Sequence, residues 1–148
     1  MRFYIDNKKM KPDELIANEI MKNLKEALEE VTGSKGAAKA IANKIGKNLG
    51  VMLAEKNKFR TMKEAISFLE KNGLMTVNNL KTGEEIEVVA KNTVESVPGS
   101  DLPLCWFIGG ILSGIAEKLE SETYLARELK CPEVGESACR FIIERIRI

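Results

Sequence analysis

Histidine is absent from this chain of 148 residues. Without an imidazole there is no histidine for general acid–base catalysis, no Ser-His or Cys-His nucleophile pair, and no imidazole metal ligand. Cysteine is scarce, with three residues, and aromatic side chains make up only 5% of the sequence. Any metal site must therefore use thiolates and carboxylates.

The charge balance and the apolar runs exclude further classes of protein. The formal net charge is +1, from 23 basic and 22 acidic residues, so a nucleic-acid-binding protein is not indicated. The longest uncharged apolar run, Leu102–Ala116, is too short to span a bilayer and predicts a buried helix. Residues 1–12 lack the apolar core of a signal peptide, and an odd number of cysteines argues against disulfides. We therefore expect a reduced, cytoplasmic protein.

Hydrophobic periodicity and turn residues predict four helices and four strands. The predicted helices cover residues 12–32, 34–55, 61–71 and 102–120, and the predicted strands cover residues 74–80, 84–90, 122–129 and 138–148. Thr61 and Glu64 form a capping box at the start of the third helix, and Asp101 is the expected cap of the fourth. The residues before Pro12 include a possible short strand or arm at 2–5.

The predicted order is α-α-α-β-β-α-β-β. Because strand pairs and helices are segregated along the chain, this order predicts an α+β fold in which helices cover an antiparallel sheet. No linker or internal repeat is apparent, so residues 1–148 are expected to form a single domain.

Two of the predicted helices carry small residues on one face. In the helix over 34–55, an i, i+4 stripe comprises Ala38, Ala42, Gly46 and Gly50, beside an apolar stripe of Ile41, Ile45, Leu49 and Met52. In the helix over 102–120, the small residues are Gly109, Gly110, Ser113 and Gly114. Glycine costs about 1 kcal/mol in a helix interior, so these positions require a reason. Close helix packing and the wall of a ligand pocket both provide one.

Three cysteines and a glutamate form a candidate metal site, namely Cys105, Glu128, Cys131 and Cys139. A hairpin would bring Glu128 and Cys131 opposite Cys139, and Cys105 would lie at the positive end of a helix, which favours thiolate. Four protein ligands would complete a structural zinc shell with no open position. From the spacing alone, three packed reduced cysteines or a reactive thiol are the alternatives.

The segment from Cys105 to Glu144 resembles the signature of the four-vinyl reductase (4-vinyl reductase) domain family. The resemblance rests on the helix start CWFIGG and on the segment ELKCPEVGESACRF. It implies a fold similar to the ligand-binding domains of NO-signalling and Golgi-transport proteins, including sensor domains of aromatic-catabolism regulators and TRAPP vesicle-tethering subunits. It also implies a homodimer, an apolar pocket, and structural zinc on Cys105, Glu128, Cys131 and Cys139.

The favoured function is a zinc-containing binding module, a sensor or carrier for an apolar small molecule. The expected pocket residues are Gly46, Gly50, Trp106, Phe107, Gly110 and Gly114. Phenol recognition through a histidine, as the resembling phenol sensors achieve it, is excluded because the chain has none.

Two other functions compete with this one. A dimeric interaction scaffold without a ligand would use the lysine-rich helix face at residues 35–47 to meet an acidic partner, although that face is equally explained as solvated. A reductase of tetrapyrrole metabolism is not favoured, since neither a dinucleotide-binding glycine motif nor a P-loop is present. The sequence predicts no catalytic residue.

Overall fold

The computed structural model describes residues 3–5, 8–10, 12–91, 93, 95, 105–130 and 138–146. In chain order its elements are β1 (Phe3–Ile5), β2 (Lys8–Met10), α1 (Pro12–Thr32), α2 (Lys35–Asn57), α3 (Met62–Lys71), β3 (Thr76–Lys81), β4 (Glu85–Lys91), α4 (Trp106–Glu120), β5 (Tyr124–Lys130) and β6 (Ala138–Arg145). The predicted order is confirmed from α1 onward. The short antiparallel pair β1–β2 precedes it, and the sequence analysis missed β2, since three residues are too few for alternation to be recognised.

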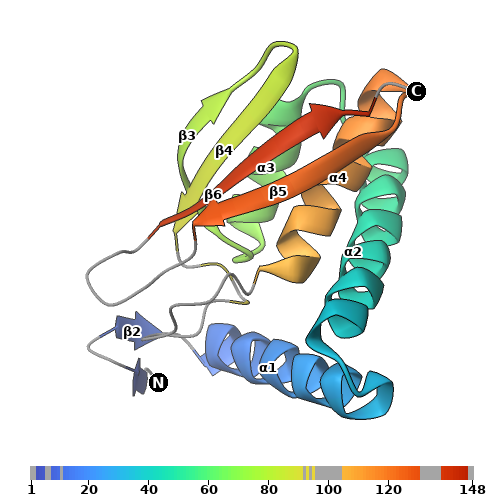
Figure 1. Cartoon of the computed structure of the whole chain (residues 1–148). Coiled ribbons are helices and arrows are strands. Elements are labelled where there is room, and N and C mark those ends of the chain that lie inside the picture. Colours follow the sequence, from blue (N-terminus) through green and yellow to red (C-terminus); the bar gives the residue numbers. More distant parts are fainter. Residues whose placement is uncertain are drawn as a thin grey trace.

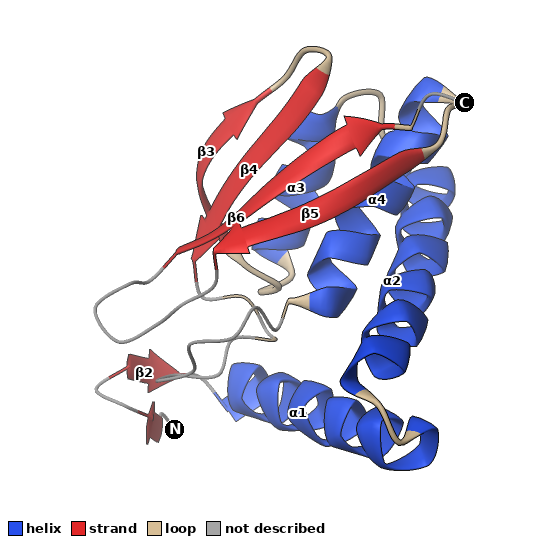
Figure 2. Ribbon diagram, viewed as in Figure 1, coloured by secondary structure: helices blue, strands red, loops and turns tan. Residues whose placement is uncertain are grey.

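Four strands form an antiparallel sheet in the order β3-β4-β6-β5, with β3 and β5 at its edges. Helices α3 and α4 cover one face of this sheet, and α2 packs along α4 (Figures 1 and 2). The α+β prediction, with helices over an antiparallel sheet, is therefore confirmed.

Alternation along the central strands places one set of side chains in the core. On β4, Ile86, Val88 and Ala90 are buried, and their register partners on β6 include the buried Phe141 and Cys139. The buried face of the sheet packs against α3 and α4. Because α4 is buried through Ala116, the apolar run that the sequence identified is explained by this core. No helix among the described residues is both long and apolar enough to cross a membrane.

Local signals account for the helix ends. Gly33 adopts a φ of 73° directly after α1, a conformation that glycine takes without strain. At the start of α3, Thr61 Oγ1 accepts a hydrogen bond from the Glu64 amide at 3.2 Å, while Glu64 Oε2 accepts one from the Arg60 amide at 2.7 Å. The capping prediction is confirmed, with the return bond displaced by one residue from its usual donor.

The start of α4 differs from the prediction. The helix begins at Trp106, with Cys105 as the preceding cap residue, rather than at residue 102. The expected cap, Asp101, lies outside the described residues. The Cys105 side chain makes no capping hydrogen bond. A distant carboxylate, described below, binds the first amides of the helix instead, which explains why the local sequence near Cys105 contains no cap signal.

The buried face of α2 is its small-residue stripe. Its buried residues are Ala38, Ala42, Gly46, Gly50 and Ala54. The larger apolar residues Ile41, Ile45, Leu49 and Met52 are instead 36–44% exposed. The small stripe is buried because it allows the backbone of α4 to approach, whereas bulky side chains would hold the two helices apart. The apolar stripe is therefore left on the molecular surface.

Candidate metal centre and adjoining hollow

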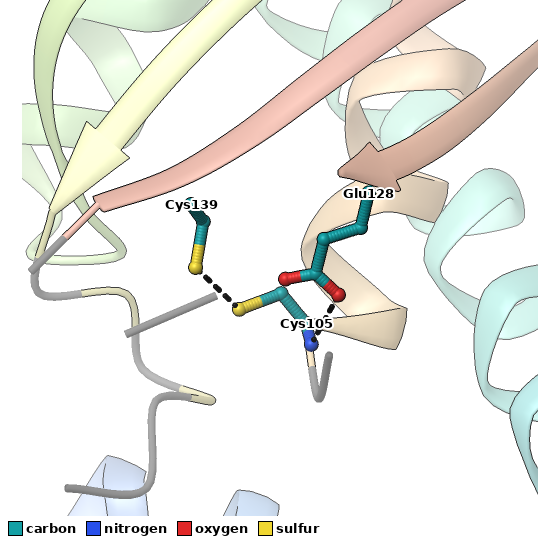
Figure 3. A group of neighbouring side chains, drawn as sticks. All are labelled: Cys105, Glu128 and Cys139. Atoms are coloured by element: carbon teal, nitrogen blue, oxygen red, sulfur yellow. Dashed lines mark hydrogen bonds between the residues drawn. The ribbon is translucent and has the colours of Figure 1, made fainter. Parts of the chain in front are cut away.

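Three of the four expected metal ligands converge. Cys105 precedes α4, Glu128 lies on β5 and Cys139 on β6, and one ligand atom from each lies within 4.8 Å of the other two. Figure 3 shows the Cys105 and Cys139 thiols facing one another, with the Glu128 carboxylate beside Cys105. The two Sγ atoms are 3.2 Å apart, and the Cys105 amide donates to Glu128 Oε1 at 3.2 Å. The fourth expected ligand, Cys131, lies outside the described residues.

The fold explains this convergence. Glu128 pairs with Phe141 across the β5–β6 ladder, and Cys139 lies two residues before Phe141, so both side chains face the helix-covered side of the sheet. Cys105 meets them where the chain enters α4. Both cysteines are buried, and Thr93 Oγ1 lies 3.1 Å from Cys105 Sγ.

The donor set fits zinc. With Zn–S bonds of about 2.3 Å and Zn–O bonds of about 2.1 Å, ligand atoms in a tetrahedral site lie roughly 3.4–3.8 Å apart. The observed distances, 3.2 Å between thiols and at most 4.8 Å within the cluster, are of this size. Two buried thiols and a carboxylate from three separate elements also match the soft and borderline ligands that zinc selects.

A buried ion pair beside this cluster was missed by the sequence analysis. Glu95 accepts hydrogen bonds from the Phe107 amide at 2.8 Å and the Ile108 amide at 2.5 Å, so it supplies the cap that α4 lacks locally. Lys25 of α1 lies 3.2 Å from Glu95 Oε2 and 5.3 Å from the centre of the Trp106 ring. The only signal in the sequence was a lysine on an apolar helix face, four residues after Met21.

Burial dominates the electrostatics of this pair. It raises the pKa of the Glu95 carboxyl above its ordinary value, while Lys25 and the two amides of α4 act in the opposite direction. The carboxylate therefore depends on those partners to remain charged. Through them it connects α1 to the first turn of α4, directly after the metal ligand Cys105.

The expected pocket glycines lie in the contact between α2 and α4. A Cβ atom on Gly46 would collide with the Phe107 carbonyl oxygen, and one on Gly110 would collide with the Asn43 carbonyl oxygen. Gly50 and Gly114 meet α4 and α2 backbone in the same way. Close helix packing, one of the two explanations left open by the sequence, therefore accounts for these four residues.

A hollow of about 810 Å³ lies between α2 and the edge strand β5, and we call it the α2–β5 hollow. One side is formed by α2 residues between Gly36 and Lys47, and the other by residues 125–129 of β5. Cys105, Trp106, Gly109 and Phe141 complete the lining. Trp106 was expected in a pocket and lines this one, whereas Phe107 packs in a small core with Ala38 and Ala42. The volume falls within the usual range for small-molecule sites.

The free edge of β5 faces this hollow. Outside the β6 ladder, the Tyr124 amide donates to Glu117 Oε2 at 3.0 Å, and Lys47 Nζ donates to the Tyr124 carbonyl at 3.0 Å. These side chains close one end of the hollow. Backbone polar groups alternate in direction along an antiparallel strand, so the amide and carbonyl of Ala126 also point away from β6.

Comparison with family models identifies the domain in the second half of the chain. The model of the V-4-R domain, the 4-vinyl reductase domain, matches residues 85–145, the segment from β4 to the end of β6 that contains all four expected metal ligands. No significant match was found among curated protein sequences.

Three solved structures share the fold. The chain is similar to the phenol-responsive sensory domain of the transcription activator PoxR bound to phenol, at 18% identity and a TM-score of 0.64, with 97% of this chain and 80% of that chain covered. It is also similar to a vinyl-4-reductase family protein from Methanocaldococcus jannaschii, at 18% identity, a TM-score of 0.63, and coverage of 95% and 85%. A trafficking protein particle complex subunit 3 from Naegleria fowleri, covalently bound to palmitic acid, matches at 15% identity, a TM-score of 0.58, and coverage of 90% and 97%.

At these identities the structural matches establish the fold and leave the ligand undetermined. The matched segment begins at the first residue of β4 and ends at the last residue of β6. It therefore spans the sheet strands and the helix that hold the described part of the metal cluster. Residues 85–145 of this chain belong to the 4-vinyl reductase (V-4-R) domain family.

Proposed function

We propose that the whole chain, residues 1–148, acts as one small-molecule-binding module, a sensor or carrier, with a structural zinc on Cys105, Glu128, Cys131 and Cys139. One observation carries the proposal: Cys105 and Trp106 are consecutive residues, and both line the α2–β5 hollow. Any ligand in the hollow would therefore contact the first turn of α4, whose preceding residue is a metal ligand. The name of one structural neighbour, a phenol-responsive sensory domain, supports a sensing role.

The residues divide the work between them. Zinc, when bound, would supply a cross-link between the start of α4 and the β5–β6 hairpin, as structural zinc sites do. Trp106 and Phe141 provide apolar surface for a ligand, and Asn43, which donates to the Trp106 carbonyl at 3.4 Å, joins α2 to the same turn. A shell of four protein ligands has no position for a substrate, which favours binding over catalysis. Thiolate ligands also require a reducing compartment such as the cytoplasm.

The second candidate is a homodimeric interaction scaffold. It is favoured by one observation, the exposed apolar stripe of Ile41, Ile45, Leu49 and Met52 on α2. Contiguous apolar patches of this kind mark protein interfaces. A second copy of the chain is the proposed occupant, and the two functions are compatible, because this stripe and the hollow lie on opposite flanks of the buried small-residue stripe.

Ligand binding can be measured through Trp106, which is the only tryptophan of the chain. Titration with octanol, a neutral apolar probe, should change the fluorescence of Trp106 with a saturable dependence. Gly109 lines the hollow, and a Cβ there meets no atom closer than 3.7 Å, so a longer side chain at this position would enter the hollow. We expect Gly109→Leu to weaken octanol binding at least about tenfold, because the added side chain occupies the site.

The matched control is Asn48→Leu, which adds the same side chain at an exposed position of α2 outside the lining. It should leave octanol binding unchanged. Equal binding by the parent and Gly109→Leu would place the ligand elsewhere. Absence of saturable binding by the parent, both for octanol and for its carboxylic acid counterpart, would overturn the proposed function of the hollow.

A further inference from the structure

We infer that the α2–β5 hollow selects a small organic acid, whose carboxylate lies between Lys39 and Lys44 and whose hydrocarbon part lies against Trp106. This inference rests on the proposed function and specifies the chemical class of its ligand. It replaces a purely apolar compound by an amphipathic anion.

The hollow has more positive than negative charge in its lining. Four cations line it, Lys39, Lys44, Lys47 and Arg127. Lys47 pairs with Glu117 at 2.9 Å, and Arg127 pairs with Glu144, so these two are neutralised by carboxylates. Within the described part of the chain, neither Lys39 nor Lys44 has a carboxylate partner. Two positive charges beside the hollow are therefore not balanced by the protein residues described.

Nearby acidic residues do not compensate for these two lysines. Glu128 is the only acidic residue in the described lining, and its carboxylate is directed at Cys105. In α2 the first carboxylate is Glu55, which pairs with Lys118 at 3.4 Å. The positive end of the α2 dipole adds to the potential, since Gly36 in its first turn also lines the hollow.

The remaining lining suits the rest of such a molecule. Trp106, Leu125 and Phe141 offer apolar surface for a hydrocarbon body. The Ala126 amide points away from β6 toward the hollow and provides a donor that a carboxylate oxygen can accept from. An amine of the same size would face two lysines instead of a counter-charge. The hollow therefore discriminates by charge as well as by shape.

The test compares three probes with the same hydrocarbon chain, octanoate, octanol and octylamine, by titration of Trp106 fluorescence. Octanoate should bind about five- to tenfold more tightly than octanol, the range expected for two partly exposed charge contacts, and octylamine should bind most weakly. Raising the salt concentration should weaken octanoate binding and leave octanol binding unchanged, because only the former depends on exposed charges.

Lys39→Glu/Lys44→Glu should reverse the preference between octanoate and octylamine. Lys22→Glu/Lys56→Glu makes the same change in net charge at exposed positions outside the lining and should preserve the preference for octanoate. Both variants change exposed side chains, and thermal unfolding checks that each remains folded. If octanol and octanoate bind equally, or if the first variant leaves the preference intact, charge selection is overturned while the proposed function stands. If no probe binds, both are overturned.

Discussion

At the scale of single residues, two adjacent glycines of α4 have opposite surroundings. A Cβ on Gly109 would make only ordinary contacts, the nearest being the Ala126 Cβ at 3.7 Å. A Cβ on Gly110 would collide with the backbone of α2 at Asn43. Glycine at position 109 is therefore not required by packing, whereas glycine at position 110 is required by the close approach of two helices.

We predict opposite effects of the same substitution at these neighbours. Gly109→Ala should raise the free energy of unfolding by about 0.5–1 kcal/mol, because alanine is the better helix former and the space for its methyl group exists. Gly110→Ala should lower it by about 1–3 kcal/mol through overpacking. Urea denaturation of both variants measures the difference. Similar effects at the two positions would contradict the observed helix contact.

The pair of Lys25 and Glu95 is a second residue-scale test, because both side chains are buried. Lys25→Met or Glu95→Gln alone should lower the free energy of unfolding by about 3–5 kcal/mol, since each leaves a buried group without its counter-charge. The double variant should lose less than the sum of the two. Simple additivity in a double-mutant cycle would show that the two residues act independently.

At the scale of elements, the metal cluster joins parts of the fold that few other contacts connect. It links the residue before α4 to β5 and β6, all within the segment that matches the 4-vinyl reductase domain. The ion pair of Glu95 adds α1 to the same end of α4. Changes at this end are therefore expected to reach both the hairpin and the first helix.

Metal content tests the element-scale link. Protein purified without added zinc should contain about one zinc per chain by elemental analysis, and both Cys131→Ser and Cys139→Ser should lose it together with thermal stability. Cys139 is buried in the described cluster, so its variant tests the observed geometry, whereas Cys131→Ser tests the predicted fourth ligand. Retention of zinc by Cys131→Ser alone would remove that residue from the site, and a metal-free parent would overturn the zinc proposal.

At the scale of the whole molecule, α2 presents three surfaces with different roles. Its small residues pack on α4, its lysines line the hollow, and its large apolar residues are exposed. Burying the exposed stripe against a second copy would leave the α2–β5 hollow accessible on the other flank. A dimer could therefore bind a ligand in each chain.

We predict that Ile45→Asp/Leu49→Asp shifts the chain toward a monomer. A charge placed in an apolar interface is costly to desolvate, so dimerisation should weaken by at least about a hundredfold. Sedimentation at several protein concentrations measures this change. The double variant Lys22→Glu/Lys56→Glu, which leaves the stripe intact, serves as the control. An unchanged association constant would exclude the stripe as the interface.

Much of the architecture could be predicted because it follows local rules. The capping residues, the positive-φ glycine after α1 and the alternation of β4 and β6 indicate the elements directly. The choice of Cys105, Glu128 and Cys139 also came from the sequence, and the fold brings these three together. Cys131 stays a prediction.

The sequence by itself determined which helices and strands form, because periodicity and caps act within a few residues. Only the tertiary structure decided which face of α2 is buried, since two apolar faces compete and close approach to α4 favours the smaller residues. It also decided that Glu95 caps α4 and that Lys39 and Lys44 flank a hollow. These relations join residues far apart in the chain, and no local pattern carries information about such distances.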